Sequence, residues 1–129
     1  MTWDGSAETN GSFNITGSSQ ADIITGGAGD DTLAGDGGGD RLDGGNGHDI
    51  LNFHTANSLS EALSVDGGKG TDVVRFLDNS ISIVDLDFSY VANIEAVSFS
   101  DGNNSAVFGA STSQAIGSVF FDITSGSGD

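Results

Sequence analysis

Aspartates recur at a fixed spacing in the first half of this 129-residue chain. Read in blocks of nine, residues 17–52 are GSSQADIIT, GGAGDDTLA, GDGGGDRLD and GGNGHDILN, and the sixth residue of every block is an aspartate. These aspartates are Asp22, Asp31, Asp40 and Asp49. A further block, GGKGTDVVR at residues 67–75, carries Asp72 at the same offset. One side-chain type held in one phase over so many blocks indicates a repeated binding function.

The chemistry that fits these aspartates is cation binding. If the blocks stack, equivalent carboxylates come together, and two carboxylates about 5 Å apart repel by roughly 3 kcal/mol at an effective dielectric constant of about 20. A divalent cation between them replaces this repulsion with attraction. The first six residues of a block are rich in glycine, which takes positive φ easily and lets backbone carbonyls point toward one centre. Carboxylate and carbonyl oxygens suit Ca²⁺, whereas Mg²⁺ demands strict octahedral geometry.

The last three residues of each block are expected to form the short strand that positions its loop. Neighbours along a strand point to opposite faces, so the eighth residue should point inward while the seventh and ninth point outward. The eighth residues are all large aliphatics, namely Ile24, Leu33, Leu42, Leu51 and Val74. One inward side chain per block makes a thin core, and the absence of cysteine excludes a disulfide as its support. Bound metal is the remaining source of rigidity.

The blocks follow the pattern GGxGxDxUx and resemble the RTX (repeats-in-toxin) calcium-binding nonapeptide family, also called hemolysin-type repeats. The resemblance implies an all-β fold: a right-handed parallel β-roll or β-helix solenoid with Ca²⁺ in the turns, continuing into a less metal-dependent β segment. It also implies that successive blocks turn on opposite edges of the roll. A calcium ion then lies between the loops of blocks n and n+2.

The resemblance implies at least two calcium ions and makes a third possible. Each ion would be held by the sixth-position aspartates of two loops, by the carbonyls of positions two and four of the first loop, and by the carbonyls of positions one and three of the second. The first ion would be held by Ser18, Gln20, Asp22, Gly35, Gly37 and Asp40, and the second by Gly27, Gly29, Asp31, Gly44, Asn46 and Asp49. The third, held by Gly45, Gly47, Asp49, Gly67, Lys69 and Asp72, requires residues 53–66 to act as one opposite-edge block with five extra residues. Because GSSQAD lacks two of the usual glycines, the site with Ser18 should bind more weakly.

The chain divides into a lead-in coil (1–16), a calcium-binding roll (17–52), an insert or edge cap (53–66), a further repeat (67–75) and a C-terminal β-rich solenoid segment (76–129) that ends at the start of a next repeat. Counting back in nines puts Ile15 at an inward position and Phe13 in the slot of a missing aspartate, which predicts a metal-free first coil. In the insert, Ser58 and Glu61 fit a capping box before a helical turn, and a polar loop is the alternative.

After residue 75 the glycines thin out and apolar residues alternate, from Ile81 and Ile83 through Val97 and Phe99 to Val107 and Val119. This pattern predicts short strands with turns at residues 78–79, 101–104 and 111–114, and a core built from phenylalanines. Glu95 lies among these apolar residues. It could cap a calcium near Asp72 or be a plain exposed strand residue.

Composition limits the partners. Nineteen acidic residues against three basic ones give a net charge of −16, which should repel nucleic acid and anionic membranes. No run approaches the ~18 apolar residues of a membrane span, and the first ten residues lack the pattern of a Sec signal peptide. With His48 and His54 as the only histidines and no HExxH or GxSxG motif, we expect no enzyme. Trp3 and Tyr90 could contact a sugar but are more simply packing residues.

Two functional classes remain, and for both the resemblance implies a bacterial, extracellular protein that is exported by a type I secretion channel. In the first, the chain is a calcium-binding structural module of a large repetitive surface protein, an adhesin or surface-layer-like protein, whose neighbouring units are its partners besides an unidentified cell-surface or glycan partner. In the second, it is the folding and secretion domain of an RTX protease, lipase or toxin. FNITGS at residues 13–18 recurs as FDITSG at 121–126, an offset of twelve nonapeptides, which favours a tandem array.

Overall fold

The computed structural model describes residues 1–100, 102–107, 109 and 116–122. Most of its regular secondary structure consists of short parallel strands. One sheet has the spatial order β1 (Thr2–Asp4), β3 (Ile23–Gly27), β5 (Arg41–Gly47), β7 (Ser64–Gly70) and β10 (Val91–Ala92). The second has the order β13 (Ile116–Asp122), β11 (Ile94–Phe99), β8 (Val73–Phe76), β6 (Ile50–Phe53), β4 (Thr32–Ala34) and β2 (Asn14–Thr16). A small third sheet pairs β12 (Ser105–Ala106) with β9 (Ser82–Ile83).

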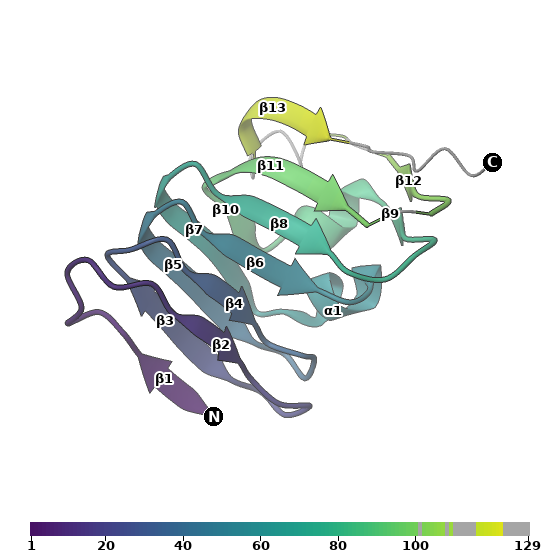
Figure 1. The fold of residues 1–129 in the computed structure, drawn as a ribbon. Coiled ribbons are helices and arrows are strands. Elements are labelled where there is room, and N and C mark those ends of the chain that lie inside the picture. The colour runs from purple at the N-terminus through teal and green to yellow at the C-terminus, as the bar shows by residue number, and fades with distance from the viewer. Residues whose placement is uncertain (101, 108, 110–115, 123–129) are drawn as a thin grey trace.

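From β1 to β8, successive strands alternate between the two large sheets, as Figure 1 shows, so this part of the chain coils as a flattened solenoid. In the repeats, Ile24 pairs with Leu42 and Leu33 with Leu51, which means that each block lies beside the second block after it. The predicted all-β parallel roll, with successive blocks on opposite sides, is therefore confirmed.

The core is a double column of eighth-position side chains. Ile24, Leu33, Leu42, Leu51 and Val74 are at most 1% exposed. The seventh-position Ile23, by contrast, is 49% exposed, because neighbouring residues of a strand point to opposite faces. Each repeat thus adds only one apolar side chain to the core, as its pattern predicted.

The insert at residues 53–66 lengthens one coil without breaking the stack. Leu42 pairs with Val65 and Leu51 with Val74, so a coil that crosses the insert is longer by five residues than a coil of two nonapeptides, which pairs Leu33 with Leu51. The extra residues form α1 (Ala56–Glu61), whose Leu59 is buried.

The capping prediction for this helix was wrong in its residue. Thr55, with extended φ and ψ, accepts the N–H of Ser58 at 3.1 Å. Ser58 is therefore the third residue of the helix, where it donates to the cap.

Aromatic side chains thicken the core in the second half of the chain. Phe76 stacks on Phe99 with ring centroids 5.5 Å apart, and its centroid lies 6.4 Å from that of Phe53. Ile81, Ile83, Ile94 and Val97 are buried beside them. A 3₁₀ turn, η1 (Asp85–Phe88), adds the buried Phe88. The solenoid thus continues past the repeats with larger interior side chains.

Val107 does not take the inward position that alternation suggested, since it is 64% exposed. Its neighbour Ala106 packs against the core instead, so the next residue must point outward. The predicted turn at 111–114 lies outside the described residues. Among the described residues, no helix has the length and apolar character needed to cross a bilayer.

The N-terminal residues add a strand that the sequence did not predict. β1 pairs with β3 so that Trp3 lies opposite Ile24, which makes this first coil longer than a coil of two nonapeptides. The Trp3 ring meets Phe13 edge to face, with centroids 5.4 Å apart. At the opposite end, β13 pairs Phe121 with Val97, in the column that also contains Ile15. The recurrence of FNITGS would put Ile123 in that column, but Ile123 lies outside the described residues.

Candidate metal centre

The repeat aspartates lie in two columns, one along each edge of the roll. Each immediately precedes a strand, and Asp22, Asp31, Asp40, Asp49 and Asp72 are all at most 1% exposed. Asp22 and Asp40 precede strands of one sheet, while Asp31, Asp49 and Asp72 precede strands of the other. Burying ionised carboxylates is unfavourable unless they are hydrogen-bonded, paired or bound to a metal.

One oxygen of each carboxylate binds the backbone of the coil before it. Oδ1 of Asp40 accepts the Asp22 N–H at 2.9 Å, and Oδ1 of Asp49 accepts the Asp31 N–H at 2.8 Å. Oδ1 of Asp72 likewise accepts the Asp49 N–H at 2.8 Å. The structure therefore brings together Asp22 with Asp40, Asp31 with Asp49, and Asp49 with Asp72. These are the aspartate pairs that the resemblance to RTX repeats assigned to the three ions.

The second oxygen is different. Oδ2 of Asp31, Asp49 and Asp72 is buried and accepts no hydrogen bond from any described residue. Each of these oxygens faces a backbone carbonyl of the next loop on the same edge. A Cβ atom added at Gly26 would collide with both Asp31 Oδ2 and the carbonyl oxygen of Gly44. The space over the glycine is thus bounded by oxygens of two successive loops.

Carbonyls of the first loop also face the second. Gly45 has a φ of 103°, and a Cβ on it would overlap the carbonyl oxygen of Gly27. The same relation holds for Gly47 over Gly29, Gly68 over Gly45 and Gly70 over Gly47. The second- and fourth-position carbonyls of a loop therefore point toward the loop that follows, which is where the predicted ligand sets require them.

The third-position residues are less clearly placed. Asn46 and Lys69 are exposed and lie opposite each other in the register of β5 and β7. Gly37 faces open space, and it is Gly38 whose Cβ would meet Gln20 and Ser19. On the edge of Asp31, Asp49 and Asp72, the contacts thus place aspartates and first-, second- and fourth-position carbonyls between the loops. They do not place the carbonyls of Ser18 and Gln20 or the residue Gly37 there.

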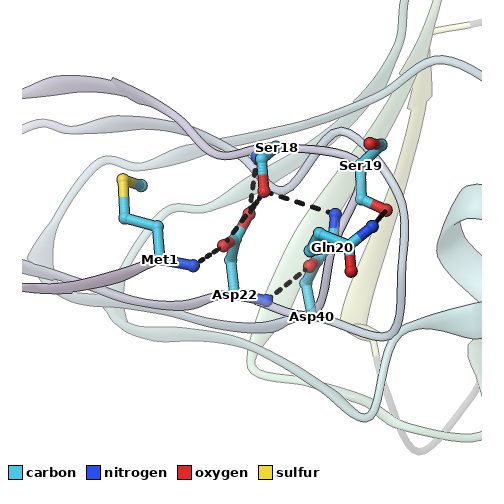
Figure 2. Close-up of polar contacts among 6 residues, drawn as sticks. All are labelled: Met1, Ser18, Ser19, Gln20, Asp22 and Asp40. Carbon is cyan, nitrogen blue, oxygen red and sulfur yellow. Dashed lines mark hydrogen bonds and ion pairs between the residues drawn. The ribbon is translucent and has the colours of Figure 1, made fainter.

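The site that contains Ser18, drawn in Figure 2, differs from the others in the partners of its aspartate. Asp22 Oδ1 is paired with the N-terminal ammonium group of Met1, while Oδ2 accepts the Ser18 N–H at 2.5 Å and lies 3.2 Å from the Ser18 hydroxyl. The Gln20 N–H in turn donates to the Ser18 hydroxyl at 3.3 Å. Asp22 Oδ2 already accepts the Ser18 N–H, so a cation here would compete with a hydrogen bond that Oδ2 of Asp31, Asp49 and Asp72 lacks.

Electrostatics separates Asp22 from the other repeat aspartates. Burial raises the pKa of Asp31, Asp40 and Asp72 above the ordinary aspartate value, and raises that of Asp49 to about 6, with the charges of Asp72 and Asp31 adding to the shift. The ammonium group of Met1 lowers the pKa of Asp22. Where the pKa of an aspartate is raised, its surroundings destabilise the ionised carboxylate, and a bound cation would stabilise it.

No group of three or more His, Asp or Glu side chains within the described part of the chain could hold a metal by itself. What the loops offer is two carboxylates at a time together with backbone carbonyls. An all-oxygen set of this kind fits Ca²⁺, which takes six to eight oxygen ligands in flexible geometry. It does not fit a transition metal that prefers nitrogen or sulfur.

The edge that carries Asp31 begins with an aromatic ring. The Phe13 N–H donates to Asp31 Oδ1 at 2.7 Å, so Phe13 occupies the aspartate position of the coil before. A Cβ at Gly5 would collide with the Gly26 carbonyl oxygen and lie 2.8 Å from Phe13 Cε2. At Gly26 the corresponding neighbour is the Asp31 carboxylate. The Phe13 ring thus stands where a carboxylate oxygen stands in the repeats.

Glu95 continues the column of Asp31, Asp49 and Asp72. The sequence had left this position near Asp72 as one of two alternatives for Glu95. Its Oε2 accepts the Asp72 N–H at 2.7 Å, as an aspartate would. The signal was present in the sequence, because the spacing from Asp49 to Asp72 is repeated from Asp72 to Glu95. The carbonyl of Asn93, which no motif marked, lies over Gly67.

The histidines take part in contacts between loops. His48 Nδ1 accepts the Thr71 N–H at 2.9 Å. His54 lies between two carboxylates, with Nδ1 3.0 Å from Asp78 Oδ1 and Nε2 3.5 Å from Asp36 Oδ1. These contacts join neighbouring coils and do not combine a base with a nucleophile.

Comparison with known proteins agrees with this geometry. A family model of the RTX calcium-binding nonapeptide repeat matches residues 16–51, with four copies. Searches of curated proteins and of solved structures found no match. Repeats of this family bind calcium and serve a structural role. The match covers the four consecutive blocks and not the loop of Asp72 or the strands that follow it.

Proposed function

We propose that this chain, whose residues 16–51 are RTX calcium-binding nonapeptide repeats, is a structural module that folds when Ca²⁺ binds between its loops. The observation that carries the proposal is the set of buried Oδ2 atoms of Asp31, Asp49 and Asp72, each without a hydrogen-bond donor among the described residues. A buried, unsatisfied carboxylate oxygen costs free energy that bound calcium would remove. RTX repeats are found in secreted proteins, which meet calcium outside the cell.

We assign the residues that would hold the ions from the contacts described above. The strongest site lies between Asp31 and Asp49, with carbonyls of Gly27, Gly29 and Gly44 around it. A second lies between Asp49 and Asp72, with carbonyls of Gly45, Gly47 and Gly67. The site between Asp22 and Asp40 is weaker, because the Ser18 N–H and hydroxyl already satisfy one Asp22 oxygen. Calcium supplies the positive charge that lets these carboxylates stay ionised.

Binding energy thereby becomes folding energy. At the low calcium concentration of a cytosol, the acidic chain stays extended through self-repulsion and can be threaded through a type I secretion channel. Extracellular modules bind calcium at about 10⁻⁴ to 10⁻³ M. Outside the cell the ions fill the loops and the thin core closes around them.

We place the module in a large repetitive bacterial surface protein, an adhesin or surface-layer-like protein. Support comes from the recurrence of residues 13–18 at 121–126 and from the position of β2 and β13 as the two outer strands of one sheet. The backbone register of β13 gives no further support. The recurrence aligns Phe121 with Phe13, whereas strand pairing puts Phe121 in the column of Ile15. A catalytic domain encoded upstream would instead identify the module as the folding and secretion domain of an RTX effector.

Circular dichroism in calcium and in EDTA tests the proposal. The β-sheet signal should form with calcium and be lost with EDTA, and a chain equally structured in both would refute calcium-coupled folding. Asp31→Ala with Asp49→Ala should raise the calcium midpoint. Asp4→Ala with Asp43→Ala removes the same number of charges from the exposed outer face of one sheet and serves as the control. Equal midpoints in the two double variants would remove the proposed pairing.

A further inference from the structure

We propose that a further calcium site lies beyond the repeats, between the loop of Asp72 and the start of β11, where Glu95 and the carbonyl of Asn93 replace the aspartate and first glycine of a repeat. This inference rests on the proposed calcium-binding function and extends it past residue 75. Neither the nonapeptide pattern nor the family match at residues 16–51 reaches these two residues.

The backbone register puts Glu95 in the aspartate position. Ile50 pairs with Val73, and Val73 pairs with Ala96, so Asp49, Asp72 and Glu95 each precede equivalent residues. The hydrogen bonds repeat as well. The Val73 N–H donates to the Asp49 carbonyl at 2.9 Å, and the Ala96 N–H donates to the Asp72 carbonyl at 3.1 Å.

The carboxylates repeat the contact of the preceding coil. Asp72 Oδ1 accepts the Asp49 N–H at 2.8 Å, and Glu95 Oε2 accepts the Asp72 N–H at 2.7 Å. The longer glutamate side chain thus brings its carboxylate oxygen to the same place, where it accepts the N–H of the preceding aspartate as an aspartate carboxylate does in a repeat. Glu95 is thus held at the loop by a directed hydrogen bond and not merely near it in sequence.

An unpartnered oxygen marks the space between these residues. Asp72 is fully buried, and its Oδ2 accepts no hydrogen bond from any described residue. A Cβ at Gly67 would collide with the carbonyl oxygen of Asn93 and lie 2.8 Å from Asp72 Oδ2. At Gly44 the same place is bounded by Asp49 Oδ2 and the carbonyl of Gly67. Asn93 therefore supplies the carbonyl that a first-position glycine supplies in a repeat.

The conformation of Asn93 explains how a short segment does this. Its φ is 52°, in the left-handed region that asparagine tolerates better than most residues. Its side-chain amide donates to Asp66 Oδ1 at 2.7 Å, which fixes the turn. Only three residues, 93–95, replace the six of a repeat loop. The site has fewer carbonyls than a repeat site, so we expect it to bind Ca²⁺ more weakly than the site between Asp31 and Asp49.

Counting bound ions tests the inference. Calcium would be titrated against a chromophoric chelator for the full chain, for Glu95→Gln and for Glu61→Gln. Glu61 is an exposed glutamate at the end of α1 and gives the matched control. Glu95→Gln should lose one equivalent of calcium, while Glu61→Gln should keep the full number. If Glu95→Gln binds as many ions as the full chain, with unchanged midpoints, the inference is overturned.

A second measurement needs no variant and stays valid if Glu95→Gln does not fold. The chain has three glutamates, Glu8, Glu61 and Glu95, so labelling their carboxyl carbons with ¹³C gives few signals to follow by NMR. Calcium should shift the Glu95 carboxyl carbon away from the free-carboxylate position and leave Glu61 there. A Glu95 signal that stays with Glu61 in saturating calcium refutes the site. A full chain that shows no calcium-induced folding refutes the proposed function instead.

Discussion

Asp49 is shared between two proposed calcium sites. We therefore predict that a substitution at Asp49 raises the free energy of unfolding without calcium and lowers it with calcium. Asp49 faces Asp31 on one side and Asp72 on the other, so Asp49→Asn removes a charged ligand from two proposed sites. The same substitution removes a buried charge whose pKa is raised to about 6 from an ordinary 3.8. Removing the charge should help the chain without calcium and harm it with calcium.

The magnitudes follow from the structure. A pKa difference of about two units corresponds to about 3 kcal/mol, so at pH 7.5 and without calcium Asp49→Asn should be more stable than the parent chain by up to about 3 kcal/mol. With calcium at about 100 times the dissociation constant, each occupied site contributes about 2.7 kcal/mol, and two contribute about 5 kcal/mol. The balance leaves Asp49→Asn less stable by about 2 kcal/mol in calcium.

Urea unfolding followed by circular dichroism measures both quantities. Both the EDTA buffer and the calcium buffer would contain the same concentration of an osmolyte that is excluded from protein surfaces. Such an osmolyte favours the folded state, so that the metal-free roll can be observed folded. Asp36→Asn is the control, since Asp36 is an exposed loop aspartate with a φ of 73° that asparagine accepts. If Asp49→Asn is destabilised equally in both buffers, or behaves like Asp36→Asn in calcium, the shared-ligand reasoning fails.

Three further outcomes follow from the same structure. A raised carboxyl pKa favours folding while the group is protonated and loses that contribution as the pH rises toward about 6, so the chain in EDTA should gain β-sheet signal in circular dichroism between pH 7.5 and 4.5, and a flat profile would contradict this. Phe76→Ala should lose about 3 to 5 kcal/mol in urea unfolding in calcium, because its ring lies between Phe53 and Phe99, while exposed Tyr90→Ala should stay within about 0.5 kcal/mol. Gly45→Ala should raise the calcium midpoint far more than Gly37→Ala, since both have φ near 100° but only Gly45 lies against a neighbouring carbonyl, and equal shifts would show that backbone strain alone matters.

The repeat section could be predicted from sequence because its period carries all the information that the fold needs. Each block has one inward aliphatic residue, such as Leu51, and one loop aspartate, and the resemblance to RTX repeats adds that two blocks make one coil, as the pairing of Leu33 with Leu51 shows. The pairing of Asp31 with Asp49 is a consequence of that coil length. The third-position ligands are not fixed in the same way, and Gly37 faces open space.

Beyond the repeats the coil length changes, and counting in nines no longer identifies equivalent positions. Glu95 comes into register with Asp72 only because the coil is longer there than two nonapeptides. Val107 is exposed because Ala106 takes the inward place, a choice that alternation of apolar residues alone cannot make. Thr55 caps α1 in place of Ser58 because its hydroxyl reaches the third helical N–H, a contact that depends on where the helix begins.

Phe13 stands at the start of the edge that carries Asp31, in the place of a metal ligand. Its ring fills the volume beside Gly5 that an oxygen ligand would need, so raising the calcium concentration cannot add an ion before Asp31. Among the described residues, the ions proposed for that edge then lie between Phe13 and Glu95. A shorter or longer stretch of coils would change the number of ions without changing how any one of them is bound.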